Sequence, residues 1–546
     1  MLAPRFVTHV APDFGRRSPG TSGLRRPTAE FRQPHYLASF AAAILAEAVP
    51  RHGATIVLGG DGRTFVGDAV QQILRLAAAW GVERAIVGQG GLLSTPAASH
   101  LIRLRGAVGG IILSASHNPG GPDGDFDIKY NGENGGPAPP AITDAIADRA
   151  TALREYTMVE HDNIAIDRLG EQHLGPMVVE VVDPVADYAT LMESLVDVAA
   201  IRALFARGFT MQFDAMHAVT GPYAVELLER RLGAPAGSVV RGTPLPDFGG
   251  EHPDPNLVHA AELVEAVMHR GEYDFGAASD GDGDRNMIVG RGTYVAPSDS
   301  LAVLAAQLPL LPGYAAGLAG VARSMPTSRA VDRVAAALAI PCYETPTGWK
   351  FFCSLLDAGR ITLCGEESFG TGSSHVREKD GLWAVLCWLN ILAVTGQSVR
   401  ELLEGHWQRF GRDYYSRHDY EDVSTASGDA VMGSLRERLA TLPGTVVAGR
   451  TILAADDFAF TDPVDGSTAT AQGIRLLLDG DARIVVRLSG TGTRGATIRL
   501  YLEQVGSGTP RVTDDVQSQL ASVIAVALTV TNIATHTGRP APSVIT

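Results

Sequence analysis

Short apolar segments alternate with amphipathic segments along most of this chain. Residues 55–58, 82–87 and 109–113 are apolar runs typical of buried strands, and residues 66–80 and 95–103 carry apolar side chains at helical spacing. The alternation returns later in the chain, with strands expected at 209–213, 275–279, 320–324, 342–344 and 361–364, and helices at 221–232, 298–308, 329–338, 348–358 and 382–394. Strands that alternate with helices predict an α/β fold with mixed or mostly parallel sheets.

The pattern changes near residue 410. Residues 481–488 and 496–502 are expected to form paired strands, and a last helix is expected at about 513–528. This part of the chain predicts a separate α+β domain. The stretch 405–415 is interpreted as a linker.

Composition limits the classes of function. With 546 residues, the chain is long enough for about three to four domains. Its formal net charge of −15 argues against nucleic acid or an anionic membrane as a partner, because both need a basic face. An anionic substrate would therefore need a locally basic pocket.

No targeting or membrane segment is expected. The first 20 residues lack the apolar core of a signal peptide, and the most apolar run, 382–394, is too short to span a bilayer. The four cysteines form no CxxC pair and lie among apolar neighbours, which indicates buried thiols in a reducing compartment. We expect a cytoplasmic protein.

An acidic loop indicates a metal site. Asp280, Asp282 and Asp284 alternate with glycines, so their carboxylates can share one side of the backbone and converge on one point. Three oxygen ligands suit Mg²⁺ or Ca²⁺. An EF-hand loop is rejected because Arg291 occupies the position of its bidentate glutamate and the flanks look like strands. Three clustered carboxylates without a cation would repel one another.

A second loop carries a candidate nucleophile. Ser116 follows the apolar strand 109–113 in a loop rich in Gly, Asn and Pro, a composition that also suits a plain turn. A phosphorylated Ser116 would supply the phosphate oxygen that Mg²⁺ prefers. His117 is not expected to activate its neighbour, because adjacent side chains diverge in extended backbone. Lys129 is a candidate base if nearby cations lower its pKa, and otherwise an ordinary surface lysine.

Two further loops have the composition of sugar and phosphate sites. Residues 365–370 carry acidic and hydroxyl groups that suit sugar hydroxyls. Residues 487–493, with Arg499 on the next strand, combine hydroxyls, glycine N–H groups and two arginines, as a phosphate cradle requires, although a polar hairpin turn would look similar. Together with Arg25 and Arg285, these arginines would supply the locally basic pocket.

In combination, these loops resemble the α-D-phosphohexomutase superfamily, and within it the phosphoglucomutase branch. The similarity is carried by GTSGLR, SASHNPGG, FDAMH, FGGEHPDPNL, DGDGDRNMI, RSMPTS, ETPTGWKFF, CGEESFGTGS, REKDGLWAVL and RLSGTGT with GATIRLY, from about residue 20 to residue 503. The resemblance implies four domains around a central cleft, three similar α/β domains with mixed sheets and a C-terminal α+β domain. We place them at 1–200, 201–312, 313–412 and 413–546.

The resemblance also implies a role for each motif residue. Ser116 would be the phosphoserine and, with Asp280, Asp282 and Asp284, a ligand of Mg²⁺. Arg25, Lys129 and Arg285 match basic residues at the transfer centre, and His117 matches a neighbour of the serine whose role stays open. The sugar would contact Thr347, Gly348, Glu366, Ser368 and Lys379. The phosphate that is not transferred would contact Arg487, Ser489, Thr491, Thr493 and Arg499.

The implied activity is the interconversion of glucose 1-phosphate and glucose 6-phosphate, with Mg²⁺ and glucose 1,6-bisphosphate as cofactor and intermediate, and with hexose phosphates as the only expected partners. The alternatives are a phosphomannomutase, a phosphopentomutase, a glucose 1,6-bisphosphate synthase or a non-catalytic adaptor of the same fold. The GEESFG loop favours glucose. The oligomeric state, monomer or dimer, stays open.

Overall fold

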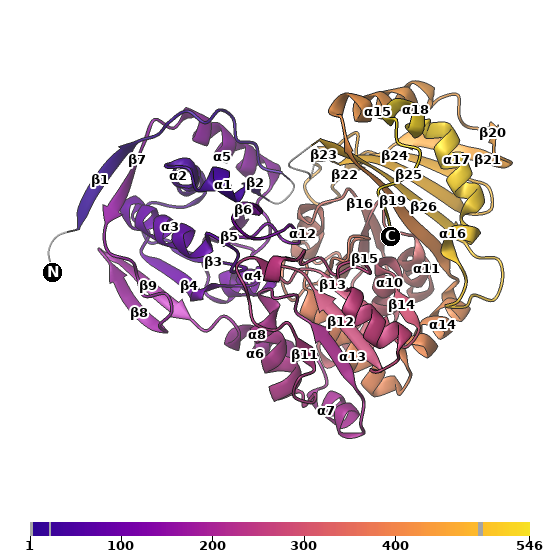
Figure 1. Ribbon diagram of the computed structural model, residues 1–546, viewed down its shortest axis with the longest axis horizontal. Helices are drawn as coiled ribbons and strands as arrows, with labels where there is room; N and C mark the ends of the chain where they lie inside the picture. The colour runs from indigo at the N-terminus through magenta and orange to yellow at the C-terminus, as the bar shows by residue number, and fades with distance from the viewer. Residues whose placement is uncertain (1–3, 21–22, 490–494) are drawn as a thin grey trace.

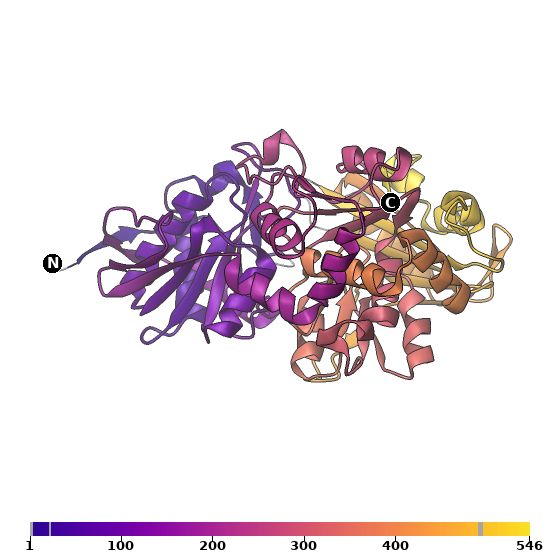
Figure 2. The ribbon, with the colours of Figure 1, turned by 90° about the horizontal axis from the view of Figure 1, so that it is seen from below.

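The computed structural model describes residues 4–20, 23–489 and 495–546. These residues form four main sheets in chain order, and Figure 1 follows the chain from the first sheet at one end of the molecule to the last at the other. Figure 2, turned by 90°, keeps the same order of colours along the long axis. The predicted fold class is confirmed: three domains have mixed α/β sheets and a fourth differs from them.

The first sheet has seven strands in the order β2-β6-β5-β3-β4-β9-β8. Strand β3 runs parallel to β4 and β5, and β6 runs antiparallel to β5. Its strands are β2 (Leu24–Pro27), β3 (Thr55–Gly60), β4 (Arg84–Leu92), β5 (Gly109–Leu113), β6 (Asp125–Gly132), β8 (Gly170–Leu174) and β9 (Met177–Val182). Its helices are α1 (Thr28–Phe31), α2 (Tyr36–Ala48), α3 (Val66–Trp80), α4 (Thr95–Leu104) and α5 (Pro140–Ala152), and β1 (Arg5–Val10) pairs with β7 (Glu155–Glu160) beside it.

The second sheet repeats the central strands of the first. Its order is β11-β10-β12-β13-β14, in which β10 is parallel to β11 and β12, and β13 is antiparallel to β12. The strands are β10 (Met211–Asp214), β11 (Val239–Val240), β12 (Phe275–Ser279), β13 (Asn286–Gly290) and β14 (Thr293–Val295). The helices of this segment are α6 (Ala186–Leu195), α7 (Val198–Ala206), α8 (Thr220–Ala224), η1 (Val225–Arg231), η2 (Phe248–Gly250), α9 (Ala261–Val264) and η3 (Glu265–His269).

The third sheet repeats the arrangement again, in the order β16-β15-β17-β18 with the same parallel, parallel and antiparallel pairings. The strands are β15 (Val321–Ser324), β16 (Cys342–Thr345), β17 (Leu363–Gly365) and β18 (Thr371–Ser373). The helices are α10 (Pro297–Gln307), η4 (Leu308–Leu310), η5 (Pro312–Tyr314), α11 (Ala330–Leu338), α12 (Lys350–Asp357), α13 (Gly381–Thr395) and α14 (Val399–Phe410). Helix α10 packs on α11 and β17, so it covers the third sheet although it precedes the boundary expected at residue 312.

The fourth sheet is antiparallel throughout, in the order β20-β21-β24-β25-β26-β19-β27. The strands are β19 (Asp413–Val423), β20 (Val446–Val447), β21 (Arg450–Asp457), β24 (Ile474–Leu478), β25 (Ala482–Ser489), β26 (Ala496–Val505) and β27 (Val544–Ile545), with the small pair β22 (Phe460–Thr461) and β23 (Thr468–Ala469) beside them. The helices α15 (Thr425–Arg438), α16 (Val516–Gln519), α17 (Ala521–Thr531) and α18 (Ile533–Thr537) belong to the same segment.

Two large apolar cores hold the α/β part together. One lies in the first domain, around α2, α3 and β3. The other runs mainly through the second and third domains and includes first-domain residues such as Ile86 and Leu101. It contains the mostly apolar helix α13, which packs against β12 and β13 of the second sheet as well as β18 of the third. Because most of this core comes from the second and third domains, these two are packed together as a unit. The four domain ranges as drawn from the sequence stay a prediction.

The expectation of a linker at 405–415 is wrong. Helix α14 occupies this stretch up to Phe410, and β19 begins at Asp413. The helix begins with a capping box, in which the side chains of Ser398 and Glu401 each bond the other's backbone N–H, so its start is encoded locally. Among the polar side chains of 405–415, Gln408 and Arg409 lie on the exposed face of the helix, while His406, Arg412 and Asp413 are buried.

Among the described residues, no single helix is long and apolar enough to cross a membrane. Helices α13 and α14 taken together reach that length and composition, and they are bent by 86° relative to each other.

Candidate active site

The repeated sheet order brings three equivalent loops together. In each α/β sheet, the loop in question connects the third parallel strand of the repeated arrangement to the antiparallel strand that follows it: 114–124 after β5, 280–285 after β12 and 366–370 after β17. The loops contact one another directly. Ser116 Oγ donates a hydrogen bond of 2.7 Å to Asp280 Oδ2, and the backbone of Arg285 forms an antiparallel bridge with that of Gly370. Three motifs that are far apart in the sequence therefore form one site.

Ser116 is held in an unusual backbone conformation. Its φ is +52°, in the left-handed region that residues other than glycine seldom adopt. Ser114 Oγ accepts the Ser116 backbone N–H at 2.9 Å, and Arg63 Nη2 donates to the Ser116 carbonyl oxygen at 2.8 Å. Arg63 is paired with Asp61 at 2.9 Å, and both side chains are fully buried. Contacts to its backbone therefore fix the orientation of the Ser116 hydroxyl toward the second domain.

The acidic loop forms the predicted cage. One carboxylate oxygen from each of Asp280, Asp282 and Asp284 lies within 4.8 Å of the others, and all three side chains are buried. Burial, followed by the charges of Asp284 and Asp282, raises the pKa of Asp280 well above its usual value. Asp282 Oδ1 and Asp284 Oδ1 are buried without a hydrogen-bond partner among the described residues. A divalent cation with a preference for oxygen ligands fits these two oxygens.

Cationic side chains surround the cage. Lys129 Nζ lies 2.8 Å from Asp282 Oδ2, Lys379 Nζ lies 2.9 Å from Asp284 Oδ2, and Arg285 Nε lies 3.8 Å from both Asp280 and Asp284. The cleft as a whole is lined by both acidic and basic side chains, and the basic ones that the sequence led us to expect, Arg25, Arg285 and Arg499, are among them.

Lys129 is a candidate base only if nearby cations lower its pKa, and the structure places carboxylates beside it instead. Lys129 is buried on β6, and burial alone would lower its pKa. Its charged neighbours are the carboxylates of Asp282 and Asp284 rather than cations, and they raise the pKa above the ordinary lysine value. In this arrangement the Lys129 ammonium is a charged hydrogen-bond donor to Asp282, and its role as a base stays a prediction.

Arg25 and His117 stand on the first-domain side of the site. Arg25 Nη1 donates to Asn118 Oδ1 at 3.0 Å, and its Nε lies 3.4 Å from Asp127 Oδ2. Burial, with the charges of Arg285 and Arg25, lowers the pKa of His117 well below its usual value. His117 is therefore a neutral ring in the cleft, directly beside Ser116 in the sequence.

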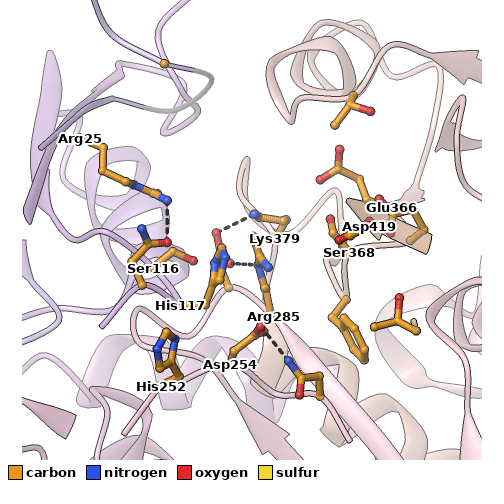
Figure 3. Close-up of a pocket in the computed structure, with 18 of the residues that line it drawn as sticks. Arg25, Ser116, His117, His252, Asp254, Arg285, Glu366, Ser368, Lys379 and Asp419 are labelled. Atoms are coloured by element: carbon orange, nitrogen blue, oxygen red, sulfur yellow. Dashed lines mark hydrogen bonds and ion pairs between the residues drawn. The ribbon is translucent and has the colours of Figure 1, made fainter. Parts of the chain in front are cut away.

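The cleft has a volume of about 790 Å³ and is lined by all four domains. Figure 3 shows Ser116 and Arg25 on one side, Lys379 and Arg285 in the middle, and Glu366, Ser368 and Asp419 across from them. Every residue expected to contact sugar lines it: Thr347, Gly348, Glu366, Ser368 and Lys379. The Gly348 backbone N–H donates to Glu366 Oε1 at 3.1 Å, so the two sugar-site loops are joined.

The residues expected at the second phosphate are only partly in the cleft. Arg499 on β26 lines it. Arg487 instead donates to the Gln472 carbonyl oxygen at 3.2 Å, and neither it nor Ser489 lines the part of the cleft that the structure describes. Thr491 and Thr493 lie outside the described residues.

Several lining residues were not singled out from the sequence. Arg417, Asp419 and Glu421 enter the cleft from β19, and His252 and Asp254 enter it from the loop before α9. The loop could have been found, because FGGEHPDPNL was among the matching motifs. The strand residues carry no local signal, since charged residues alternate on the surface of many strands.

The comparisons with known proteins agree with this geometry. Models of the phosphoglucomutase/phosphomannomutase family match α/β/α domain I at residues 16–157, domain II at 186–293 and domain III at 297–410, and a model of the phosphoglucomutase-1 C-terminal domain matches 412–543. A phosphoglucomutase of Rhizobium radiobacter is 57% identical over 97% of this chain and 98% of its own length. Phosphoglucomutase-1 of Homo sapiens is 49% identical over 99% of this chain and 100% of its own length.

A solved structure is similar over its whole length. The open form of the exocytosis-sensitive phosphoprotein pp63/parafusin, a phosphoglucomutase from Paramecium, superimposes with a TM-score of 0.91 at 44% identity, covering 100% of both chains. Taken together, the family models, the full-length relatives and this structure show that the chain belongs to the phosphoglucomutase/phosphomannomutase family.

Proposed function

We propose that the protein is a phosphoglucomutase, which interconverts glucose 1-phosphate and glucose 6-phosphate through phosphorylated Ser116 and glucose 1,6-bisphosphate. The observation that carries the proposal is the 2.7 Å contact between Ser116 Oγ and Asp280 in a cage of three buried carboxylates. A phosphate on that hydroxyl would lie beside the cage, and the surrounding cations would face it. The phosphoglucomutases that match the chain over its full length support the same activity.

The first transfer uses residues of the first two domains. The bond between phosphorus and Ser116 Oγ breaks, a bond to O6 of glucose 1-phosphate forms, and the proton of that hydroxyl passes to a base whose identity is open. Asp280, Asp282 and Asp284 would hold Mg²⁺, which neutralises charge on the transferred phosphoryl group. Arg25, Lys129 and Arg285 donate to its oxygens. Positioning and charge neutralisation supply most of the catalysis in such reactions.

The second transfer requires the intermediate to turn end for end. Glu366 and Ser368 face sugar hydroxyls in either orientation, while Arg499 holds the phosphate that is not being transferred. Ser116 Oγ then bonds to the phosphorus at O1, the bond between that phosphorus and O1 breaks, and O1 takes up the proton that the serine hydroxyl gives up. Glucose 6-phosphate leaves, and the phosphoenzyme is regenerated. Approach of the fourth domain would exclude water, which would otherwise hydrolyse the phosphoserine.

We place this activity in the cytoplasm, because the four cysteines are free thiols and three of them are buried.

Glucose rather than mannose is the proposed sugar. Turnover of glucose 1-phosphate and mannose 1-phosphate measured side by side decides between them.

A coupled assay tests the proposal. Purified protein with glucose 1-phosphate, Mg²⁺ and a trace of glucose 1,6-bisphosphate is expected to form glucose 6-phosphate, and a chelator is expected to stop the reaction.

Ser116→Ala is expected to lower kcat at least about 10⁴-fold, since the step then lacks its covalent carrier. Ser194→Ala, which removes an exposed hydroxyl on α6, serves as the control and is expected to keep wild-type rates. Isomerisation by the Ser116→Ala variant near the wild-type rate would contradict the assignment.

A further inference from the structure

Four charged side chains form a chain of ion pairs between the third and fourth domains. Arg417 Nη1 lies 2.8 Å from Glu367 Oε2, and Arg417 Nε lies 3.1 Å from Asp419 Oδ1. Arg499 Nε lies 3.6 Å from Asp419 Oδ2. All four line the cleft, and Glu367 stands between the two proposed sugar contacts Glu366 and Ser368. The loop 366–370, which carries these proposed sugar contacts, is thus connected through Arg417 and Asp419 to Arg499.

The backbone fixes Asp419 between the two arginines. Arg417 and Asp419 are two residues apart on β19, so both side chains point to the same face of the sheet. Asp419 is also the direct cross-strand partner of Arg499 on β26. The carboxylate therefore reaches both guanidinium groups without any rearrangement of the sheet.

Burial makes these charges strongly interacting. The side chain of Asp419 is 4% exposed, that of Arg417 14% and that of Arg499 23%. Neither arginine has a geometrically good hydrogen bond at Nε among the described residues, although both Nε atoms are buried. In the described part of the chain, Asp419 is thus the carboxylate that contacts both arginines, while Glu367 contacts Arg417 alone. A phosphate would use the same donors better, because a phosphate dianion has more charge and more acceptor oxygens than a carboxylate.

We propose that Asp419 is an internal competitor of the phosphate that is not transferred. It shares its single charge between Arg417, which Glu367 also pairs, and Arg499 while the site holds no phosphate, and its charge opposes the dianion once that dianion binds. The proposal rests on the proposed function, in which Arg499 binds this phosphate. Asp419 thereby limits the affinity of the fourth domain for phosphate.

A limited affinity for phosphate favours turnover in a reaction whose intermediate must turn around in the site. Each turnover requires the phosphate at Arg499 to leave, and tight binding of the ground state would slow that step without helping transfer. Removing the competing charge should therefore strengthen binding and reduce turnover. If Asp419 served only to position the arginines, its removal would weaken binding instead.

The test compares Asp419→Asn with wild type. The variant is expected to bind inorganic phosphate about tenfold more tightly, a difference of about 1.4 kcal/mol. It is also expected to lower KM for glucose 1-phosphate and to lower kcat, which a purely structural defect would not do together. Asp429→Asn makes the same charge change on the exposed surface of α15 and is expected to leave all three quantities unchanged.

Two further variants distinguish competition with the phosphate from simple positioning of the arginines. Asp419→Glu keeps the charge and is expected to restore phosphate affinity toward the wild-type value, even if its fit is imperfect. In an Arg499→Ala background, Asp419→Asn is expected to lose most of its effect, because the partner of the competing charge is gone. Unchanged or weaker phosphate binding by folded Asp419→Asn would overturn the proposal.

Calorimetry measures the affinity for inorganic phosphate without catalytic turnover, so it tests the role of Asp419 separately from the mutase activity. A protein without mutase activity that still shows the tenfold difference would reject the proposed function alone. An active mutase without the difference would reject the role of Asp419 alone.

Discussion

At the scale of single residues, the conformation of Ser116 depends on a close approach between two domains. Gly281, between two residues of the acidic cage, packs its α-carbon against the Ser116 carbonyl oxygen, and a Cβ at that position would clash with this oxygen. The same oxygen accepts the hydrogen bond from Arg63. A displacement here would therefore be transmitted to the nucleophile and to the loop 114–124.

Gly281→Ala is expected to fold and to lose about 100-fold in kcat/KM, because a shift of about 1 Å at the reacting group has effects of that size. Coupled assays and thermal unfolding measure the two properties. Gly433→Ala on α15 is the control: nothing lies within 4 Å of its added Cβ, so activity is expected to be unchanged and stability to rise by roughly 0.5–1 kcal/mol. Wild-type activity in Gly281→Ala would show that the contact does not position the serine.

At the scale of secondary structure elements, segments with strong periodicity were predicted well. Helix α3 and strand β12 begin and end where the pattern placed them, at Val66–Trp80 and Phe275–Ser279. The failures come from packing that one segment cannot reveal. Strand β6, which carries Lys129, was not predicted, and α14 was mistaken for a linker because its polar face dominates its composition.

The residues of the site divide in the same way, into those that a local sequence pattern reveals and those that only contacts between segments reveal. Ser116 and the three aspartates were found because each sits in a loop whose composition is distinctive over a few residues. Asp419 and Arg63 could not be found in that way. Asp419 belongs to the site through its cross-strand neighbour Arg499. Arg63 belongs to it because it follows β3, the neighbour of β5, and donates to the Ser116 carbonyl oxygen. Contacts of this kind are set by topology and not by local pattern.

Helix α14 also carries a titratable group in its buried face. Burial, with the charges of Arg333 and Arg409, lowers the pKa of His406 to about 4. The folded protein thus binds this proton less readily than the unfolded chain, whose histidine titrates near 6.5. The contribution of His406 to stability is complete above about pH 6.5 and is lost as the pH falls toward 4.

The free energy of unfolding of wild type, relative to His406→Leu, is expected to fall by about 2 kcal/mol between pH 7.5 and pH 5. Denaturant unfolding of both proteins across this range measures the difference. Leu403→Met changes the packing of the same helix without a titratable group, so its difference from wild type should not depend on pH. A constant difference for His406→Leu would mean that this histidine does not titrate as the structure indicates.

At the scale of the whole molecule, the site is assembled from pieces of all four domains. The first supplies Ser116, the second the acidic cage, the third Glu366 and Ser368, and the fourth Arg499. The second and third domains share a large apolar core, while the fourth has its own core. The fourth meets the third through ion pairs such as Arg417–Glu367 and through a small apolar cluster around Met325. Such an interface permits relative movement more readily than a large shared core does.

This arrangement predicts that a ligand with a phosphate at each end draws the domains together. In a Ser116→Ala background, glucose 1,6-bisphosphate cannot transfer a phosphoryl group to the serine, so a stable complex forms. One phosphate would face Arg25 and Arg285 and the other Arg499, and a ligand that contacts both sides favours the closed arrangement. Small-angle scattering is expected to show a smaller radius of gyration when the bisphosphate is added.

Arg499→Ala in the same background is expected to abolish the contraction, because the fourth domain then loses its charge contact with the ligand. Arg436→Ala, which breaks an exposed ion pair with Asp457 in the same domain, is the control and should contract like its parent. Contraction that persists without Arg499 would show that other groups bring the fourth domain in. Scattering that is unchanged in every variant would show that the cleft works without closing, and water would then have to be excluded from the phosphoserine by the sugar alone.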